Sequence, residues 1–299
     1  MSAAGLYQRF DDVWLLDGVR TPMVDYNGAL ADASPTDMGI KVAREILART
    51  DVNPQRVDSM LAGNMAPGGF DQFYVPRHIG LYAGVPVEVP ALMVQRICGT
   101  GFELFRQAGE QIMAGIASTV LLVGTESMTR NPIAAFEHRN GFKLGQLPQF
   151  KDYMWEALTD PAAGISMIQT AENLAKQYGI TRTDTDAFAA LSFERAVAAQ
   201  QAGWFDGEIV PVVSEKFERE GYKARGRKLV GKVTSVERDT HPRPTPAEVL
   251  GKLRAVYPDG VQTGGNSSAL TDAAAAAVVV GGAQLRDGGS AAGRTPLAR

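Results

Sequence analysis

The stretch from Ala91 to Met113, ALMVQRICGTGFELFRQAGEQIM, carries the clearest structural signal of this 299-residue chain. Its opening run, Ala91–Gln95, is mostly apolar and predicts a buried strand. From Gly101 onward, apolar residues recur at helical spacing, which predicts an amphipathic helix. The sequence therefore predicts a strand–turn–helix unit with Cys98 in the turn.

Cys98 is the single cysteine of the chain and lies just before the predicted helix. The positive end of a helix dipole and the unpaired N–H groups of the first turn stabilise a thiolate, which is the nucleophilic form of the side chain. Gly99 and Gly101 allow a sharp turn and a close approach of substrate. Ligands of open parallel sheets bind at the carboxyl ends of the strands, where this turn lies. A buried, inert thiol is the alternative, and the residues alone leave both interpretations open.

Strands and helices alternate through the first part of the chain. Strands are predicted at 13–17, 57–63 and 118–124, and further helices at 71–82 and from Pro35 onward. Ser34 is placed to cap the helix that begins at Pro35, a residue that suits a first helical turn. Such alternation is typical of an α/β fold in which helices cover a parallel sheet.

A long excursion then interrupts the sheet pattern. Residues 127–160 are polar and rich in Gly and Pro, helices are predicted at 166–177 and 182–202, and residues 214–245 are charged. Insertions of this length are usually functional. A small-residue run at 273–282 predicts a closing strand. The expected domains are the first part of a sheet domain, an inserted and mainly helical loop domain, the closing part of the sheet domain and a linker, at 1–126, 127–245, 246–290 and 291–299.

Three further features each admit two interpretations. The Gly264–Ser268 loop is either a tight turn or a ligand cradle. Met167 is either a core residue or a soft wall for a flexible, pantetheine-like chain. The basic cluster at 216–232 is either a solvated loop face or a landing site for a phosphorylated ligand. The rigid turn at 241–244 adds to the second interpretation, because it is suited to fix the guanidinium of Arg243.

Composition and charge argue against several classes of protein. A formal net charge of −3 argues against a general nucleic-acid binder. One cysteine excludes an intrachain disulfide and indicates a reducing compartment, and together with three histidines it argues against a Cys-rich zinc site. The longest apolar run, 273–280, is too short to span a bilayer, and the N-terminus lacks a secretory signal pattern. We therefore expect a cytoplasmic protein with no membrane span.

The three histidines are weak candidates for a catalytic base. His78 falls in a predicted helix, whereas His138 and His241 fall in polar loops. None of them has a cysteine partner nearby in the sequence. We therefore expect none of the three to act as a base.

Several separate blocks of the chain, in order, resemble the thiolase family, which comprises acetyl-CoA acetyltransferases and 3-ketoacyl-CoA thiolases. The blocks are DGVRTP, VQRICGTGFELFRQAGEQIMAG, VLLVGTESMTRNP, MIQTAENLAKQYGITR, AGWFDGEIVPV, HPRPTPAEVLGKLR and TGGNSSALTDAAAAAVVV. The resemblance covers essentially the whole chain. It implies an αβαβα-layered N-terminal thiolase domain with an inserted loop domain, an acyltransferase activity of lipid and fatty acid metabolism, and a homo-oligomer, either a dimer or a tetramer.

The resemblance also implies roles for single residues. Cys98 matches the acyl-accepting nucleophile, and its backbone N–H would form part of an oxyanion hole. Leu158 and Met167 match positions that line the pantetheine and acyl tunnel. Ser268 matches a serine that contacts coenzyme A, and Arg243 lies near a position that meets its nucleotide end. Acyl-CoA and CoA are then substrates rather than cofactors, and no metal or redox cofactor is implied.

The chain departs from the family pattern in three respects. Family members commonly carry His-Met-Gly where this chain has Ser-Met-Ile at 166–168, and often Asn-Asp-Gly-Ala where it has Leu-Thr-Asp-Ala at 270–273. The family's second αβαβα domain, with its Asn-Glu-Ala-Phe, Gly-His-Pro and Cys-x-Gly blocks, would begin where this sequence ends. Three hypotheses follow: an acyltransferase that a partner chain completes, a non-catalytic thiolase-like subunit that binds acyl-CoA or a partner, or a portion of a longer enzyme.

Overall fold

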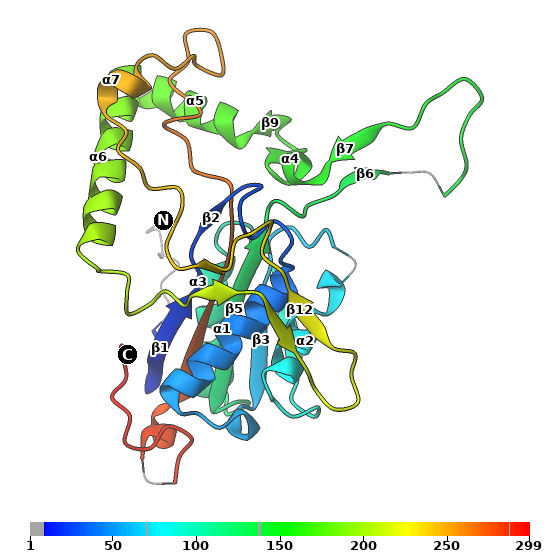
Figure 1. The fold of residues 1–299 in the computed structure, drawn as a ribbon, viewed down its shortest axis with the longest axis vertical. Helices are drawn as coiled ribbons and strands as arrows, with labels where there is room; N and C mark the ends of the chain where they lie inside the picture. Colours follow the sequence, from blue (N-terminus) through cyan, green and yellow to red (C-terminus); the bar gives the residue numbers. More distant parts are fainter. Residues whose placement is uncertain (1–8, 70, 137–138, 287) are drawn as a thin grey trace, which may run out of the picture.

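The computed structural model describes residues 9–69, 71–136, 139–286 and 288–299. A mixed six-stranded sheet runs through its lower half, in the order β1-β14-β5-β3-β4, with β2 paired to β14 (Figure 1). The strands are β1 (Val13–Arg20), β2 (Val24–Asp25), β3 (Ser59–Gly63), β4 (Ala91–Val94), β5 (Thr119–Ser127) and β14 (Thr271–Gly281).

Helices cover both faces of the sheet, which confirms the α/β layering expected from the sequence. Helices α1 (Pro35–Thr50) and α2 (Val75–Tyr82) pack on one face, and α3 (Thr100–Met113) packs on the other. Successive strand residues point to opposite faces, so Leu121 joins the core under α1 and α2 while Leu122 joins the core under α3. Ser34 caps α1 as predicted, because its Oγ accepts a hydrogen bond from Asp37 N at 3.0 Å.

The prediction of a parallel sheet is wrong for one strand. Strands β3, β4 and β5 are parallel, but β14 pairs antiparallel with both β5 and β1. The chain leaves the sheet at the end of β5 and returns to the same edge, where Asp272 pairs with Ser127. A strand that re-enters at the edge from which its neighbour left must run in the opposite direction.

Much of the inserted segment lies above this edge of the sheet, whereas its part at 215–227 lies beside α1 (Figure 1). Strands β6 (Ile133–Ala135) and β7 (Phe150–Asp152) form a projecting arm. The helices of the segment are α4 (Tyr153–Ala157), α5 (Met167–Tyr178), α6 (Arg182–Gln201) and α7 (Ala247–Leu250), and its other strands are β8 (Thr159–Asp160), β9 (Ile165–Ser166), β10 (Val212–Val213), β11 (Glu215–Phe217), β12 (Arg225–Arg227) and β13 (Ser235–Val236). The 3-10 helices η1 (Pro54–Arg56), η2 (Gln72–Tyr74) and η3 (Gly282–Leu285) complete the described elements.

The predicted domain boundaries stay predictions, but two contacts bear on how the segments pack. Helix α7 packs against α6, so residues 247–250 lie with the inserted helices. Near the C-terminus, Ala298 pairs with Leu15 beside β1.

The expectation for His138 concerns a residue outside the described part of the chain. Within the described part, no helix has both the length and the apolar character needed to cross a membrane.

Two arginines of the basic cluster are structural, so for them both interpretations from the sequence are wrong. The Arg225 guanidinium pairs with Asp37 at 2.9 Å and with Asp71 at 2.7 Å. The Arg227 side chain is fully buried and pairs with Glu215 at 2.8 Å. Because Asp37 lies on α1, the Arg225 pair ties β12 to the body of the sheet domain. Burying the charges of Arg225, Asp37 and Asp71 costs free energy, and only their pairing with one another offsets that cost.

His78 on α2 is predicted to make stability depend on pH. Burial, and then the neighbouring Arg225 charge, lower the pKa of His78, which Asp71 opposes. The unfolded state then binds more protons than the folded state as the pH falls from about 6.5 toward the folded-state pKa. The free energy of unfolding should therefore decline over this window.

Replacing His78 with phenylalanine should flatten this decline. The ring of His78 stacks on Tyr74 with centroids 5.6 Å apart, and phenylalanine keeps that contact without a titrating group. Urea denaturation of the wild type and of His78→Phe at several pH values between about 5 and about 7.5 measures the effect. Parallel pH profiles for the two proteins would contradict it.

Candidate functional site

Cys98 lies in the turn between β4 and α3, as the sequence predicts, and its side chain is exposed. This exposure excludes a sealed, inert thiol. The turn is tight, because the Arg96 carbonyl accepts a hydrogen bond from Gly99 N at 3.0 Å. Ile97 adopts a φ of 47°, a conformation that is strained for a β-branched residue. Strained backbone of this kind is found at functional sites, where the surrounding structure enforces it.

The first turn of α3 rests directly on the sheet. A Cβ atom on Gly63 would lie only 2.4 Å from Cγ2 of Thr100, so a glycine at this position permits the close approach. The Thr100 hydroxyl accepts a hydrogen bond from Arg96 N at 2.8 Å and donates one to the Ile97 carbonyl at 2.6 Å. These bonds hold both ends of the Cys98 turn against the helix.

A charged cluster braces the same turn from the side. Glu103 on α3 pairs with Arg96 at 2.7 Å and also with Arg106. Hydrogen bonds from Arg106 and then from Arg96 lower the pKa of Glu103 to about 2. The carboxylate therefore stays ionised at neutral pH and keeps Arg96, two residues before Cys98, in place.

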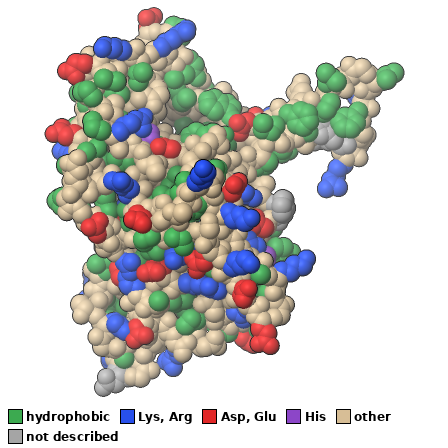
Figure 2. Space-filling model, in the orientation of Figure 1, with side chains coloured by type: hydrophobic (Ala, Val, Ile, Leu, Met, Phe, Trp, Pro, Cys, Tyr) green, Lys and Arg blue, Asp and Glu red, His purple; other side chains and the backbone are tan. Residues whose placement is uncertain are grey.

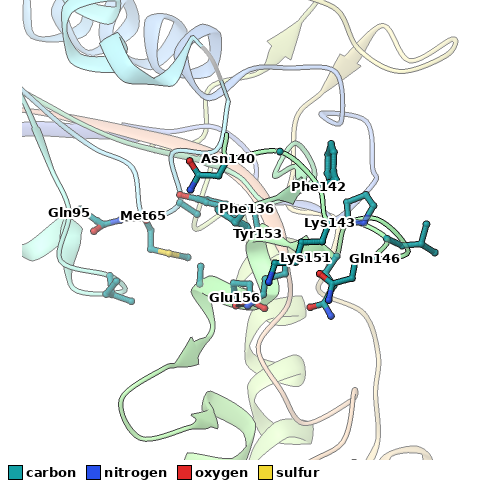
Figure 3. Close-up of a pocket in the computed structure, with 17 residues that line it drawn as sticks. Met65, Gln95, Phe136, Asn140, Phe142, Lys143, Gln146, Lys151, Tyr153 and Glu156 are labelled. Atoms are coloured by element: carbon teal, nitrogen blue, oxygen red, sulfur yellow. Dashed lines mark hydrogen bonds and ion pairs between the residues drawn. The ribbon is translucent and has the colours of Figure 1, made fainter. Parts of the chain in front are cut away.

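An open groove of about 1410 Å³ begins beside this turn (Figure 3). The strand ends contribute Met65, Gln95 and Ile97 to its lining, and the projecting arm and α4 supply the opposite side. Lys151 of the arm pairs with Glu156 of α4 at 3.0 Å. The exposed Cys98 thus lies next to a residue that lines a space large enough for a small substrate.

Leu158 and Met167 are brought together by the β8–β9 hairpin. The Met167 amide donates a hydrogen bond to the Leu158 carbonyl at 3.1 Å, at the junction of α4, β8, β9 and α5. The Met167 side chain is 49% exposed, so the core interpretation is wrong. Ser166, which departs from the family pattern, caps α5 by accepting a hydrogen bond from Gln169 N. Its side chain therefore has a structural role at this position.

Ser268 lines a second pocket, of about 450 Å³, where residues of α6 meet Met23 and the start of β14. Phe193 and His241 share the lining with it, and the Arg243 guanidinium lies 5.6 Å from the centroid of the Phe193 ring. The structure therefore brings Arg243 and Ser268 to one place, although they are distant in sequence. Residues 265–268 line this pocket, which favours the cradle interpretation of the Gly-rich loop.

His241 has a carboxylate partner that is distant from it in the sequence. Its Nδ1 lies 2.7 Å from Oδ1 of Asp25, which is 216 residues away in sequence. Asp25 belongs to β2 at the edge where the inserted segment crosses the sheet. A hydrogen bond of this kind orients the imidazole ring toward the Ser268 pocket. No local pattern in the sequence signals a pairing over such a distance.

The five candidate residues therefore form three groups. Cys98 lies at the end of the sheet, Leu158 and Met167 form a pair, and Arg243 lies against Phe193, a residue that lines the Ser268 pocket. The hydrogen bonds and ion pairs of the described residues do not join these groups to one another. A ligand that reached all three would need to be long and flexible.

Comparison with known proteins gives consistent results. The family model for "Thiolase, N-terminal domain" matches residues 13–283. A mitochondrial 3-ketoacyl-CoA thiolase of Bos taurus is 38% identical over 262 residues, which are 87% of this chain and 63% of that protein. A probable acetyl-CoA acyltransferase of Staphylococcus aureus (strain COL) is 35% identical over 261 residues, with the same coverage. The chain thus spans about 63% of the length of these curated relatives.

Comparison with solved structures gives the same family. The human mitochondrial 3-ketoacyl-CoA thiolase in complex with CoA superposes with a TM-score of 0.86 at 34% identity, covering 95% of this chain and 67% of that one. The Bacillus anthracis acetyl-CoA acetyltransferase superposes with a TM-score of 0.84 at 33% identity, covering 96% and 69%. The fold of this chain is therefore that of these enzymes over almost all of its length.

Proposed function

Since this chain belongs to the thiolase family and matches its N-terminal domain, we propose that it accepts an acyl group on Cys98 from an acyl-CoA thioester. The observation that carries this proposal is the exposed Cys98 in the braced turn between β4 and α3. Relatives named 3-ketoacyl-CoA thiolase and acetyl-CoA acyltransferase support the same reaction class.

The proposed step is an acyl transfer between two sulfur atoms. The Cys98 thiolate attacks the thioester carbonyl, a bond forms from Sγ to the carbonyl carbon, and the bond from that carbon to the CoA sulfur breaks. CoA leaves as the thiolate and takes up the proton that Cys98 has lost. Backbone N–H groups at the start of α3 are suited to hold the oxyanion that forms in between.

CoA is the proposed ligand of the two other groups of residues. A guanidinium held against an aromatic ring suits a phosphorylated nucleotide, so we assign Arg243 to that end of CoA. Ser268 lies in the adjoining pocket and is assigned a contact to CoA. Leu158 and the exposed Met167 provide apolar surface for the pantetheine and acyl parts. Thiolysis or condensation would follow from the acyl-enzyme.

Both later reactions need a further acid or base, which we place in a second thiolase domain. An apolar surface of the described chain fits such a partner. Helix α3 and the residues after it expose Phe102, Phe105, Met113 and Ile116, and Phe102 is 85% accessible. Large apolar patches of this kind mark interaction sites. Sequencing beyond the codon for Arg299, and gel filtration with and without the neighbouring gene product, distinguish one polypeptide from two chains.

Self-association and location are further proposals. The projecting arm exposes apolar side chains along its length (Figure 2). Leu144 and Leu147, between β6 and β7, are almost fully exposed. Such an arm favours contact with another copy of the chain, so light scattering should show a dimer or tetramer.

We propose a cytoplasmic location from the single cysteine, although the bovine relative is named mitochondrial. Cell fractionation checks it.

Incubation with acetyl-CoA tests the proposed function directly. Intact-mass spectrometry should show one added acetyl group, and peptide mapping should place it on Cys98. Calorimetry with CoA should show binding in the same sample. CoA binding without an acetyl adduct would instead support a non-catalytic subunit, which the names of the relatives do not favour.

A further inference from the structure

Glu126 is a partly buried carboxylate at the end of the sheet where strands β3, β4 and β5 finish, the same end at which the Cys98 turn lies. It lies near the end of β5, the strand between β14 and β3. Val120 and Leu122 of this strand belong to the core under α3. Side chains alternate along a strand, so Glu126 lies on the same face as these two residues. It is therefore on the face that α3 covers.

Its carboxylate clamps the chain that leaves β3. Oε2 accepts hydrogen bonds from Met65 N at 2.7 Å and from Ala66 N at 3.3 Å, and Oε1 accepts one from Nδ2 of Asn64 at 3.1 Å. The same Asn64 nitrogen donates to the Thr125 carbonyl at 2.8 Å, and the Asn64 side chain is buried. One carboxylate thus holds three consecutive residues beyond the end of β3.

The clamp extends to the Cys98 turn through Met65. The side-chain amide of Gln95 donates a hydrogen bond to the Met65 carbonyl. Gln95 follows β4 and leads into the turn, and β4 is the parallel neighbour of β3. Met65 and Gln95 line the same groove as Ile97, and the two lie close together in Figure 3. A continuous path of hydrogen bonds therefore runs from Glu126 through Met65 to the residue that begins the turn.

We propose that Glu126 is a positioning residue that holds the Cys98 turn in the geometry needed for acyl transfer. The proposal rests on the proposed function, because it assigns a role in that reaction. A carboxylate suits the role since both oxygens accept hydrogen bonds and neither donates one. An amide in its place would direct an NH₂ group at one of these donors and lose at least one of the three hydrogen bonds.

Keeping the Glu126 carboxylate ionised at this position costs free energy, because the side chain is partly buried. Burial raises the pKa of Glu126 although three hydrogen-bond donors oppose this, and the nearby Asp272 raises it further. The matched counterpart is Asp58, which accepts hydrogen bonds from Ser118 N at 2.9 Å and Thr119 N at 3.0 Å. Asp58 thus holds the opposite end of β5, far from the turn, by the same chemistry. It provides the control for a purely structural effect.

The test compares Glu126→Gln with Asp58→Asn in the full chain. Three quantities are measured: the rate of Cys98 alkylation by iodoacetamide, the rate of Cys98 acetylation by acetyl-CoA, and the Kd for CoA by calorimetry. Glu126→Gln should slow acetylation about tenfold or more and alkylation about threefold or more, because a displaced nucleophile loses both orientation and the helix N-terminus. The Kd for CoA should change less than about twofold, because the CoA-binding residues lie elsewhere.

Asp58→Asn should lower Tm but leave both rates at the wild-type level. Gln95→Met should repeat the loss in rate without a folding defect, because Gln95 is exposed. Equal slowing by Asp58→Asn and Glu126→Gln, or wild-type rates in Gln95→Met, would overturn the proposal. If the wild type is not acetylated at all, the proposed function fails, and the alkylation rates still decide whether Glu126 positions the thiol.

Discussion

Replacing Cys98 with serine should abolish the acetyl adduct and lower the rate of acyl transfer by about a thousandfold or more. A thiolate is a far stronger nucleophile than a serine hydroxyl at neutral pH. The turn around Cys98 is held by backbone and threonine hydrogen bonds that the substitution leaves intact. The loss should therefore be chemical rather than structural. Intact-mass spectrometry after incubation with acetyl-CoA measures it.

The Tm of the Cys98→Ser variant serves as the control. Because Cys98 is exposed, the substitution should change the free energy of unfolding by no more than about 0.5 kcal/mol. CoA affinity should also stay near the wild-type value, since Arg243 and Ser268 are untouched. An adduct of undiminished size on the variant would show that acetylation occurs on another side chain, and the role of Cys98 would be wrong.

The largest stability effect is expected at Arg225. Its guanidinium bridges Asp37 and Asp71, and the Asp37 side chain is only 9% exposed. Arg225→Leu leaves both carboxylates partly buried and without their shared partner. Breaking one side of such a pair costs about 3 kcal/mol or more. Urea denaturation followed by circular dichroism should therefore show a clear fall in the midpoint.

Lys228→Leu is the matched control for Arg225→Leu. Lys228 belongs to the same basic cluster but is exposed, so its loss should cost at most about 0.5 kcal/mol. A similar fall in the two variants would mean that the bridge between β12 and α1 contributes nothing measurable. Wild-type stability of Arg225→Leu would contradict the prediction in the same way.

Local features of the fold could be predicted from the sequence because they depend on neighbouring residues. Ser34 and Pro35 mark the start of α1 by cap and ring chemistry, and the structure begins the helix at Pro35. Strand–helix alternation predicted the layered α/β fold. The direction of β14 could not be predicted, since the run at 273–280 has no feature that records the edge at which it enters the sheet. That direction follows from the path of the excursion.

The candidate site shows the same division. Cys98 could be singled out because the strand, the glycines and the helix that surround it are adjacent in sequence. Two contacts could not be predicted in this way, because their partners come from separate elements. They are the pairing of His241 with Asp25 and the hydrogen bond from Met65 N to Glu126. The basic cluster was misjudged for Arg225 and Arg227, since a charge pattern does not state which carboxylates will face it.

The α/β class, the place of Cys98 between a strand and a helix, and the resemblance to thiolases follow from the sequence alone, because each rests on residues close together along the chain. Which side chains meet depends on how the strands pair in the folded chain. The sheet order places the ends of β3, β4 and β5 side by side, and this adjacency links Glu126 to the Cys98 turn. Hydrogen bonds act over a few ångströms, so contacts between distant segments exist only once the strands are paired.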